Sequence, residues 1–334
     1  MAEAELVIPR ALLEERFAGS SLAARLHETG RTRKGLFTIT DAFRLHDVQA
    51  DAVCRATIEC FRGFAVINAY GADESECEQL SSALAELGCM GTYVKYRARA
   101  DLRRTSRDKS APRLPIRGRA APNELQVTEN GLALQVRLDD GISTGIFLDQ
   151  RDSRSLLRQH CAGGRVLNLF CYTGAFSVAA AAGRAASVTS IDSSATALRR
   201  LDANIGLNSQ EKATHRLLKA DALEWLGRAL RRGERYDWIV LDPPSFSSRG
   251  KETFSVARQY RELAEACIGL LAPGGRLLAV TNHRQTSCDA FERLLSEAGA
   301  TVNKSCALSW VPAPRDCAPR DRDVATKSVL VTAS

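Results

Sequence analysis

The order of hydrophobic and polar positions changes along this chain at about residue 145. Beyond that point, short runs of consecutive apolar residues alternate with longer segments in which apolar residues recur every three or four positions. The short runs are typical of strands buried on both faces, and the longer segments are typical of amphipathic helices. Strands are expected at 165–170, 187–192, 215–220, 236–242, 275–281, 301–309 and 326–332, and helices from Gly174, around 197–201, after Asp221, and over 256–271 and 287–298. This alternation predicts an α/β fold with a parallel, doubly wound sheet.

The part before residue 145 is expected to hold two further pieces. Residues 1–36 are interpreted as a helical N-terminal arm, because their leucines and a phenylalanine recur at spacings near 3.6. Residues 37–122 are interpreted as a small α+β domain that ends in a basic linker. Its strands are expected at 42–46, 53–61, 64–70 and 91–97, with a turn at Arg62-Gly63 and a helix over 73–87.

The third predicted domain, residues 123–334, begins with a β-hairpin. Two alternating segments, 124–128 and 132–138, flank the dipeptide Asn130-Gly131. This dipeptide favours the positive φ angles of a type I′ turn, so it predicts a hairpin ahead of the large sheet.

The positive charge of the chain is concentrated in one stretch. Between Lys95 and Arg119 there are ten lysines and arginines against two acids, and this excess of eight is larger than the net charge of +7 for the whole chain. Such a stretch favours a polyanionic partner, because basic side chains that meet phosphates release counterions. Candidates for this contact are Arg103, Arg104 and Arg107. A solvated linker is the alternative, and the proline and serine content of SRDKSAPRLP is consistent with it.

Composition excludes several other classes of protein. The chain is 45% hydrophobic and 25% charged, as in ordinary globular proteins, and no apolar run approaches the roughly 20 residues of a membrane-spanning helix. The first residues lack the basic-then-apolar pattern of a secretion signal. The ten cysteines form no C-x-x-C pair, and the five histidines show no metal-ligand spacing. We therefore expect a cytoplasmic protein with reduced thiols, no metal and no membrane partner; oligomeric state cannot be predicted.

The first strand of the large sheet is followed by a candidate ligand loop. In doubly wound sheets, ligands bind where the carboxyl ends of the strands meet. The loop reads Phe170-Cys171-Tyr172-Thr173-Gly174 and leads into a helix, whose first amides are free to bind a ligand. Gly174 would let the backbone approach that ligand. Because the loop has a single glycine, a G-x-G-x-x-G pyrophosphate loop is poorly supported.

Two acids follow the next strands. Asp192 lies eighteen residues beyond Gly174, where a carboxylate can accept hydrogen bonds from the hydroxyls of a ribose. The alternative is that Asp192 or Ser193 caps the next helix. Asp221 is open to the same two interpretations; in a nucleoside site it would lie at the adenine edge, with the backbone N–H of Ala222 beside it.

The fourth strand ends in Asp242-Pro243-Pro244-Ser245-Phe246. Two successive prolines make a rigid, extended turn that holds carbonyl groups outward at the end of the strand. The aspartate and these carbonyls can accept hydrogen bonds from the edge of a base, and Phe246 can stack on its face. A purely structural turn is the alternative.

Six segments occur in the following order: TGIFLDQRDSR, RVLNLFCYTGAFSVAAAAG, SIDSSATALRRLDANIGLN, ADALEWL, YDWIVLDPPSFS and GLLAPGGRLLAVTN. Together they resemble class I S-adenosylmethionine-dependent RNA methyltransferases, and in particular the ribosomal large-subunit (23S rRNA) methyltransferases of the I and K types. The resemblance covers residue 38 to the end. It implies a Rossmann-like methyltransferase sheet with a small α+β central domain, to which this chain adds its helical N-terminal arm.

The resemblance also assigns roles to residues. S-adenosyl-L-methionine would be held by Phe170, Cys171, Tyr172, Thr173, Gly174, Asp192, Ser193, Asp221, Ala222 and Asp242. The catalytic group would be Asp242, Pro243, Pro244 and Phe246. Apart from the resemblance, the three arginines of the basic stretch and Arg151 are candidates for binding ribosomal RNA. Arg151 and Arg154 have an alternative role in pairing with acids of their own helix.

The chain departs from this family in ways that leave the methylated atom open. The I-type proteins begin with an RNA-binding PUA domain, where this chain has its helical arm, and HDVQADAVCRATIEC replaces an acidic, glycine-containing stretch. By resemblance, cytosine-C5 enzymes of this type share a cysteine just after the fifth strand, and this chain has Asn282 at that position. Methylation at that carbon requires a nucleophile, for which a thiolate is suited. Cys288 lies at an expected helix N-terminus that would favour its thiolate, although packing is the commoner role of such a cysteine, and Cys171 is expected to line the cofactor loop.

Three functions are therefore weighed. The first is methylation of a base of ribosomal RNA, at cytosine C5 or at guanine N7 or N2. The second, suggested by the departures from the family, is methylation of a small molecule or a protein. The third is a catalytically silent RNA-binding protein.

Overall fold

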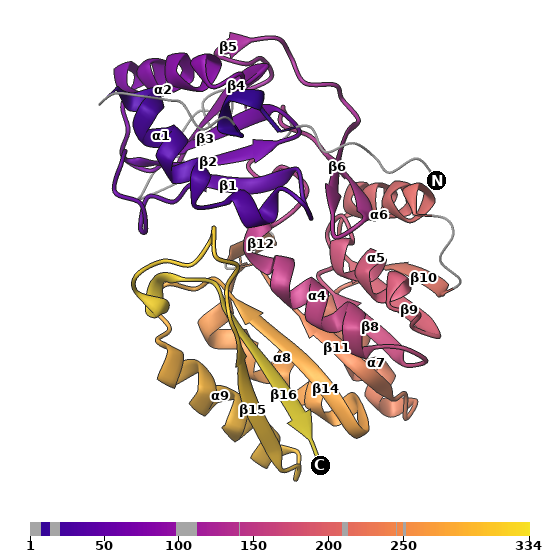
Figure 1. Ribbon diagram of the computed structural model, residues 1–334. Coiled ribbons are helices and arrows are strands. Elements are labelled where there is room, and N and C mark those ends of the chain that lie inside the picture. The colour runs from indigo at the N-terminus through magenta and orange to yellow at the C-terminus, as the bar shows by residue number, and fades with distance from the viewer. Residues whose placement is uncertain are drawn as a thin grey trace. The chain divides into compact units, whose positions relative to one another are not determined.

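The structure, a computed structural model, describes residues 8–13, 21–97, 112–139, 141–208, 213–244, 246–249 and 252–334. The chain forms two compact units, Met1–Leu148 with Pro314–Arg320, and Asp149–Ala313 with Asp321–Ser334 (Figure 1). The chain therefore passes from one unit to the other three times.

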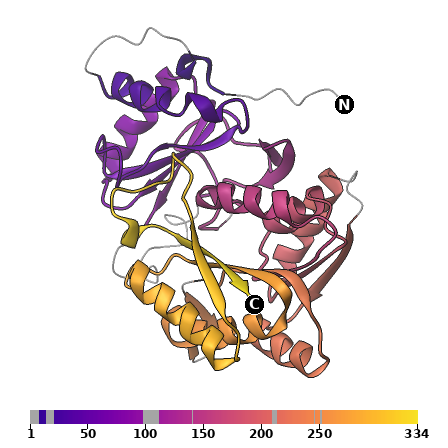
Figure 2. The ribbon, with the colours of Figure 1, turned by 60° about the horizontal axis from the view of Figure 1, so that its bottom comes forward.

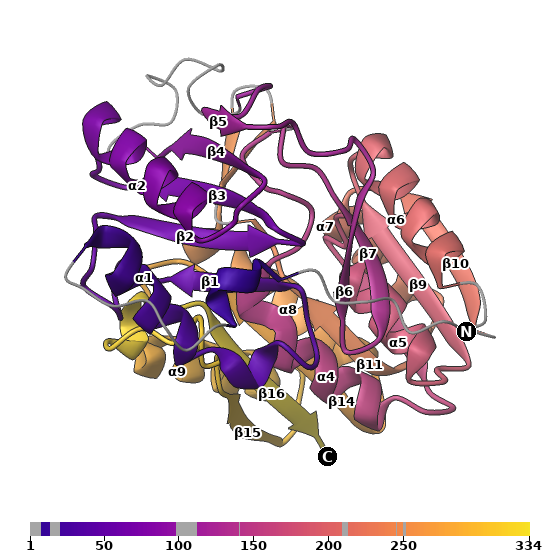
Figure 3. The same ribbon diagram turned by 45° about the horizontal axis from the view of Figure 1, so that its top comes forward.

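The first unit is built on a five-stranded sheet. Its strands, in spatial order, are β1 (Ala42–His46), β2 (Ala56–Phe61), β3 (Phe64–Ala69), β4 (Gly91–Tyr96) and β5 (Arg117–Gly118). Only β3 and β4 are parallel, because the helix α2 (Glu74–Glu86) connects them. The helices α1 (Leu22–Arg31) and α2 pack side by side against the sheet (Figure 3). The elements predicted for residues 42–97 are thus confirmed, with shifts at their ends.

The N-terminal arm belongs to the core of this unit. Besides α1 it contains two single 3₁₀ turns, η1 (Arg10–Leu12) and η2 (Lys34–Leu36). Leu12 and Leu26 are fully buried and belong to the same apolar cluster as Phe43 and Leu45 of β1. The arm was predicted as a separate piece because its own apolar spacing does not reveal which surface it covers. Phe17, part of that spacing, lies outside the described residues.

Both predicted tight turns have the expected backbone. Arg62 and Gly63 have φ angles of 47° and 81°, and Asn130 and Gly131 have φ angles of 50° and 78°. These positive values suit a type I′ hairpin turn, in which both central residues are left-handed. The second turn joins β6 (Leu125–Glu129) to β7 (Leu132–Val136).

The β6–β7 hairpin is grouped with the first unit, whereas the sequence suggested placing it in the domain 123–334. Its backbone is tied to the segment before β1. The N–H of Thr128 donates to the Asp41 carboxylate (2.6 Å), and the N–H of Asn130 donates to the Ile39 carbonyl (2.7 Å). These bonds join residues about ninety positions apart in the sequence, so local sequence patterns do not predict them.

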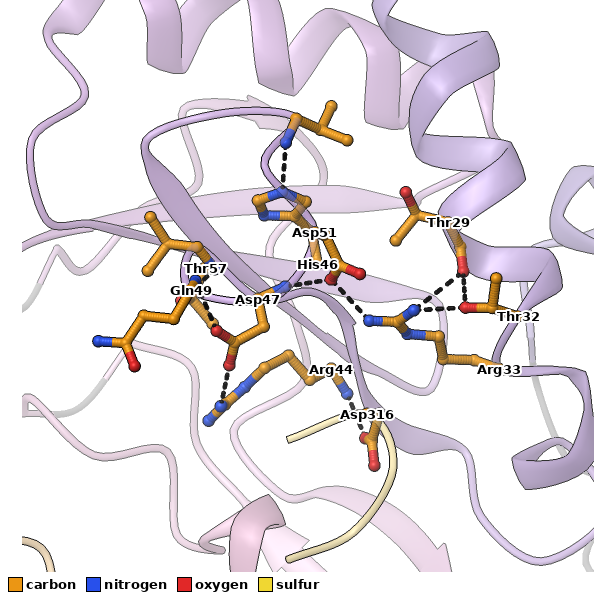
Figure 4. Close-up of polar contacts among 12 residues, drawn as sticks. Thr29, Thr32, Arg33, Arg44, His46, Asp47, Gln49, Asp51, Thr57 and Asp316 are labelled. Carbon is orange, nitrogen blue, oxygen red and sulfur yellow. Dashed lines mark hydrogen bonds and ion pairs between the residues drawn. The ribbon is translucent and has the colours of Figure 1, made fainter. Parts of the chain in front are cut away.

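A half-buried network of charged side chains connects three parts of the first unit (Figure 4). They are the N-terminal arm, the connection between β1 and β2, and the segment Pro314–Arg320. Arg33 donates to Asp51 (2.6 Å), and the same carboxylate accepts the N–H of Asp47 (2.7 Å). Arg44 of β1 is paired with Asp47 (2.6 Å), and its N–H donates to Asp316 (2.8 Å). Because β1 is an edge strand, Asp316 satisfies an amide that the sheet leaves unpaired.

The second unit contains the large predicted sheet. Its strands are β8 (Arg165–Leu169), β9 (Ser187–Asp192), β10 (Thr214–Lys219), β11 (Tyr236–Leu241), β14 (Leu271–Thr281), β15 (Cys306–Val311) and β16 (Lys327–Ala333). Their spatial order is β10-β9-β8-β11-β14-β16-β15. The first five in this order are parallel, and β16 is antiparallel to its neighbours β14 and β15. Figure 2 shows β14, β15 and β16 in colours from orange to yellow.

Helices cover both faces of this sheet, which confirms the doubly wound α/β prediction. On one face pack α4 (Arg151–His160) and α5 (Ala175–Ala182), with α6 (Ala195–Leu207) next to α5. On the other pack α7 (Ala222–Arg231), α8 (Val256–Leu270) and α9 (Cys288–Thr301).

Several details of this unit differ from the prediction, among them the start of β14, which lies at Leu271 rather than at 275. The segment after β11, expected as a loop, contains the hairpin β12 (Phe246–Arg249) and β13 (Glu252–Ser255). In addition, α9 continues to Thr301, so β15 begins only at Cys306. Among the described residues, none of the helices is at once long and apolar enough to span a bilayer.

Candidate functional site

The parallel strands β8, β9, β10, β11 and β14 end at one edge of the sheet, and the residues singled out in the sequence follow these ends (Figure 1). The 170–174 loop follows β8, Asp192 closes β9, Asp242 follows β11 and Asn282 follows β14. The structure thus brings the predicted candidates to the edge where ligands of such sheets bind.

The 170–174 loop is tightly bent. Phe170, Tyr172 and Gly174 have φ angles of 54°, 48° and 79°, so every second residue is left-handed. The Cys171 N–H donates to the carbonyl of Ile191 (3.0 Å). For residues other than glycine such angles cost energy, and they persist where the surroundings enforce them, commonly at functional sites. The loop ends at the first turn of α5, whose amides are free to bind a ligand.

Gly174 has a packing role that the sequence did not reveal. A Cβ atom built at this position would lie 2.0 Å from Cδ1 of Leu201, on α6. The residue must therefore be glycine to admit that helix as well as to adopt its φ angle. This requirement is independent of the ligand approach predicted for it.

Asp192 holds two loops together. One carboxylate oxygen accepts the N–H of Tyr172 (2.9 Å), and the other accepts the N–H of Ser194 (2.8 Å). The cap of α6 is Ser194, whose hydroxyl accepts the N–H of Ala197, so the alternative that Asp192 or Ser193 caps this helix is wrong. Each oxygen of the carboxylate has a further lone pair, which can accept a hydrogen bond from a ribose hydroxyl.

Asp221 is the N-cap of α7, as its alternative interpretation proposed. Its Oδ1 accepts the N–H of Glu224 (2.9 Å). Ala222 is the first residue of the helix, so its backbone N–H is among those without an acceptor inside the helix. Capping by Asp221 is therefore compatible with a ligand that meets the Ala222 amide at the start of this helix.

A buried polar chain below the loop was missed in the sequence. Asn168 of β8 donates to the Ser177 hydroxyl (2.8 Å), which lies 2.8 Å from the Ser190 hydroxyl of β9. All three residues are at most 2% exposed. The network fixes the first turn of α5 to both strands. The signal for it was a single asparagine inside the apolar run RVLNLF.

Asp242 has an altered acidity. Burial and the neighbouring Asp149 raise the pKa of the Asp242 carboxyl to about 7, against the opposing effect of Arg154. Of the two prolines that follow, Pro243 is buried and Pro244 is exposed. Phe246 begins β12, but its side chain lies outside the described part of the structure.

The effect of Asp149 and Arg154 on the pKa of Asp242 could not be predicted from the sequence. Both belong to the run FLDQRDSR at the start of the second unit, and Arg154 is 3% exposed. Its guanidinium carbon lies 5.8 Å from the centre of the Phe176 ring. In the sequence, the sign of this arrangement was a charged run directly before an apolar strand. The run alone does not show that its side chains lie close to the end of β11.

Both candidate cysteines have thiol pKa values above the ordinary one. Burial and the Asp323 carboxylate raise the pKa of Cys288, and the N–H of Cys288 donates to the same carboxylate (2.7 Å). Burial and Asp192 raise the pKa of Cys171. The expectation that a helix N-terminus favours the Cys288 thiolate is therefore wrong, because an acid from the β15–β16 connection occupies that terminus.

The structure describes one of the four predicted RNA-binding arginines, Arg151. Arg151 is 1% exposed and is one of the buried residues of α4, so its contact with a substrate phosphate stays a prediction that this burial does not favour. Arg103, Arg104 and Arg107 lie outside the described residues. Within the described ranges, no cluster of three or more histidine, cysteine or acidic side chains could hold a metal ion.

Sequence comparisons identify relatives of this chain. Residues 55–324 match the family described as S-adenosylmethionine-dependent methyltransferase. YwbD of Bacillus subtilis is 33% identical over 285 residues, which are 84% of this chain and 71% of that protein. The ribosomal RNA large subunit methyltransferase I of Yersinia pseudotuberculosis is 35% identical over 262 residues, which are 77% of this chain and 65% of that enzyme.

Solved structures agree with this relationship. The crystal structure of SMU.776 complexed with SAH is similar with a TM-score of 0.81 and 28% identity, over 95% of this chain and 83% of that one. SAH is the product that S-adenosylmethionine leaves after methyl transfer. The Rossmann-like fold and the cofactor expected from the sequence are confirmed. This chain belongs to the S-adenosylmethionine-dependent methyltransferase family.

Proposed function

We propose that this protein methylates a base of ribosomal RNA. The observation that carries the proposal is the rigid Asp242-Pro243-Pro244 turn, at the same sheet edge as the 170–174 loop and Asp192. The names of its relatives support ribosomal RNA as the substrate, since the Yersinia enzyme and a Deinococcus radiodurans protein, 39% identical over 183 residues (55% of this chain and 45% of that protein), are both ribosomal RNA large subunit methyltransferases.

The cofactor site suits a nucleoside bearing a sulfonium group. Bound S-adenosylmethionine supplies an electrophilic methyl group. The Asp192 carboxylate has lone pairs for the ribose hydroxyls, and Asp221 with the Ala222 amide can meet the adenine edge. The predicted cofactor contacts of Phe170, Cys171, Tyr172, Thr173 and Ser193 belong to this same proposal. Holding the donor rigidly against the base supplies much of the rate, because a fixed near-attack geometry removes most of the entropic cost.

On the substrate side, Asp242 and the Pro243 carbonyl would accept hydrogen bonds from an amino group of the base. With a pKa of about 7, the Asp242 carboxylate is also matched to take the proton that the amine loses when its nitrogen bonds to the methyl carbon. Phe246 would stack on the base.

The proposed acceptor is an exocyclic amine rather than carbon 5 of cytosine. Attack at that carbon needs a thiolate, and Cys171 and Cys288 both have raised pKa values. An amine needs no covalent nucleophile, and it offers hydrogens that Asp242 can bind. Guanine N2 satisfies this requirement; guanine N7 carries no hydrogen and would make no use of Asp242.

Nucleoside mass spectrometry tests the proposal. Ribosomal RNA from cells lacking the gene is methylated with purified protein and radiolabelled S-adenosylmethionine, then digested and analysed. We expect label in one N-methylated nucleoside, lost with Asp242→Asn and with Asp192→Ala, the latter through weaker cofactor binding. Label at carbon 5 or at N7 would overturn the choice of atom. Label in protein or small molecules alone, or RNA binding without any transfer, would favour one of the other two functions.

A further inference from the structure

A buried tyrosine lies beneath the substrate side of the sheet edge. Tyr260 is in the second turn of α8, the helix that follows the β12–β13 hairpin, and it is 1% exposed. Its hydroxyl donates to the carbonyl of Val280 (3.1 Å) and lies 3.5 Å from the carbonyl of Leu241. These carbonyls belong to β14 and β11, one residue before Thr281 and Asp242.

This hydroxyl lies where the pairing of β11 with β14 ends. Leu241 and Ala279 are the last residues paired between these strands. Beyond Asp242 the chain continues with Pro243, which has no N–H to extend the ladder. The tyrosine hydroxyl thus supplies a hydrogen bond to a strand carbonyl at the point where the β11–β14 pairing stops.

The ring of Tyr260 is itself held in place. It packs edge-on against Phe291 of α9, with ring centres 5.3 Å apart and planes at 75°. Burial and Asp242 raise the pKa of the Tyr260 hydroxyl well above its usual value, so it stays a donor throughout the neutral range. Four elements, α8, α9, β11 and β14, therefore meet at one side chain.

We infer that Tyr260 is a positioning residue for the methyl acceptor: its hydroxyl holds the ends of β11 and β14 in one arrangement and thereby places Asp242-Pro243 and Thr281-Asn282 against the base. The inference rests on the proposed function. Tyr260 is too deeply buried to touch the base or the cofactor, so it acts only through these two turns.

The variant Tyr260→Phe removes the hydroxyl and keeps the ring. We expect kcat for methyl transfer to fall about 10- to 100-fold, as expected for a misplacement of reacting groups by about 1 Å. The dissociation constant of S-adenosylmethionine and the KM for RNA should stay within about twofold, because the residues that bind both ligands are unchanged.

Tyr236→Phe is the matched control. Tyr236 is also on β11 and 3% exposed, and its hydroxyl donates to Glu234 (2.8 Å) at the strand end away from the site. It should lose similar thermal stability while kcat changes less than about twofold. Unchanged kcat in Tyr260→Phe, or an equal loss in both variants, would overturn the inference.

Two further measurements keep the outcomes separate. If Tyr260→Phe fails to fold, Phe291→Leu releases the ring without removing the hydroxyl, and kcat must again fall more than in the control. If the wild-type protein methylates no RNA, the proposed function fails. Hydrogen exchange of residues 271–287 then decides the inference: it should accelerate in Tyr260→Phe and not in Tyr236→Phe, and equal exchange would refute it.

Discussion

At the scale of single residues, Asp242 ties the rate of the reaction to pH. Its pKa is raised from 3.8 to about 7, so the folded protein holds this proton up to neutral pH. Only the ionised carboxylate can take the proton that the amine loses, because the protonated carboxyl group already holds one. We therefore expect kcat/KM to rise as pH increases through about 7 and to level off above it, measured as initial rates of methyl transfer from pH 5.5 to 8.5.

Asp149→Asn provides the control for this profile. It removes the negative charge that contributes to the raised pKa of Asp242, so the midpoint should move to lower pH. Asp242→Asn should lose the dependence together with most of the activity. A midpoint unmoved by Asp149→Asn would show that burial alone sets the pKa.

The contact between Gly174 and Leu201 predicts a coupling in stability. Gly174→Ala would force a methyl group against the leucine and strain a φ angle of 79°, so we expect a loss of about 2–4 kcal/mol in the free energy of unfolding. Leu201→Ala alone should cost about 2–5 kcal/mol. In the double variant the clash is relieved, so its cost should be at least about 1 kcal/mol below the sum, measured by denaturant unfolding. Strict additivity would contradict the packing role.

The sequence located the acids of this site but not the charges that act on them. Asp192, Asp221 and Asp242 were found because each follows an apolar run, and parallel strands place such residues at one edge. The effect of Asp149 on Asp242 depends on a contact across 93 positions of the chain. That contact exists only after folding, so periodicity and spacing cannot reveal it.

At the scale of elements, the N-terminus of α9 shows how a neighbouring segment changes the chemistry of a helix end. An isolated helix N-terminus stabilises a thiolate, yet here Asp323 binds the first amide and opposes that charge. We expect Cys288→Ala to retain methyl transfer within about twofold of the wild-type rate, because no covalent step passes through this thiol. Loss of activity with a normal melting temperature, and trapping of RNA on the wild-type protein alone, would restore the nucleophile hypothesis.

Elements were predicted well where local chemistry determines them. The Arg62-Gly63 and Asn130-Gly131 turns, the Asp221 cap and the apolar strands all follow from residues close in sequence. The β12–β13 hairpin was missed because its residues, including FSSR and ETFS, lack a clear apolar alternation. The arm was separated from its unit for a related reason: an amphipathic segment identifies its buried face but not the surface that covers it.

At the scale of the whole molecule, the excess positive charge is concentrated in one stretch of an otherwise nearly neutral chain. The stretch from Lys95 to Arg119 has an excess of eight positive charges, whereas the whole chain has +7. The remainder therefore contributes no net attraction for RNA at long range. The proposed contact with RNA phosphates is consequently expected to depend on this stretch.

Replacing Arg103, Arg104 and Arg107 by glutamine should weaken RNA binding and flatten its salt dependence. Each phosphate contact contributes about 0.7–0.9 to the slope of log K against log salt, so the slope should fall by about 2–3. Filter binding of ribosomal RNA fragments between 50 and 300 mM salt measures this change. One unit of slope corresponds to about a tenfold fall in affinity for each tenfold rise in salt concentration. Replacing three arginines of the second unit, Arg228, Arg231 and Arg232, by glutamine is the charge-matched control and should leave the slope unchanged. S-adenosylmethionine binding should be unaffected in both variants. An equal fall in both would show a general effect of net charge, and an unchanged slope in the first would identify the stretch as a solvated linker.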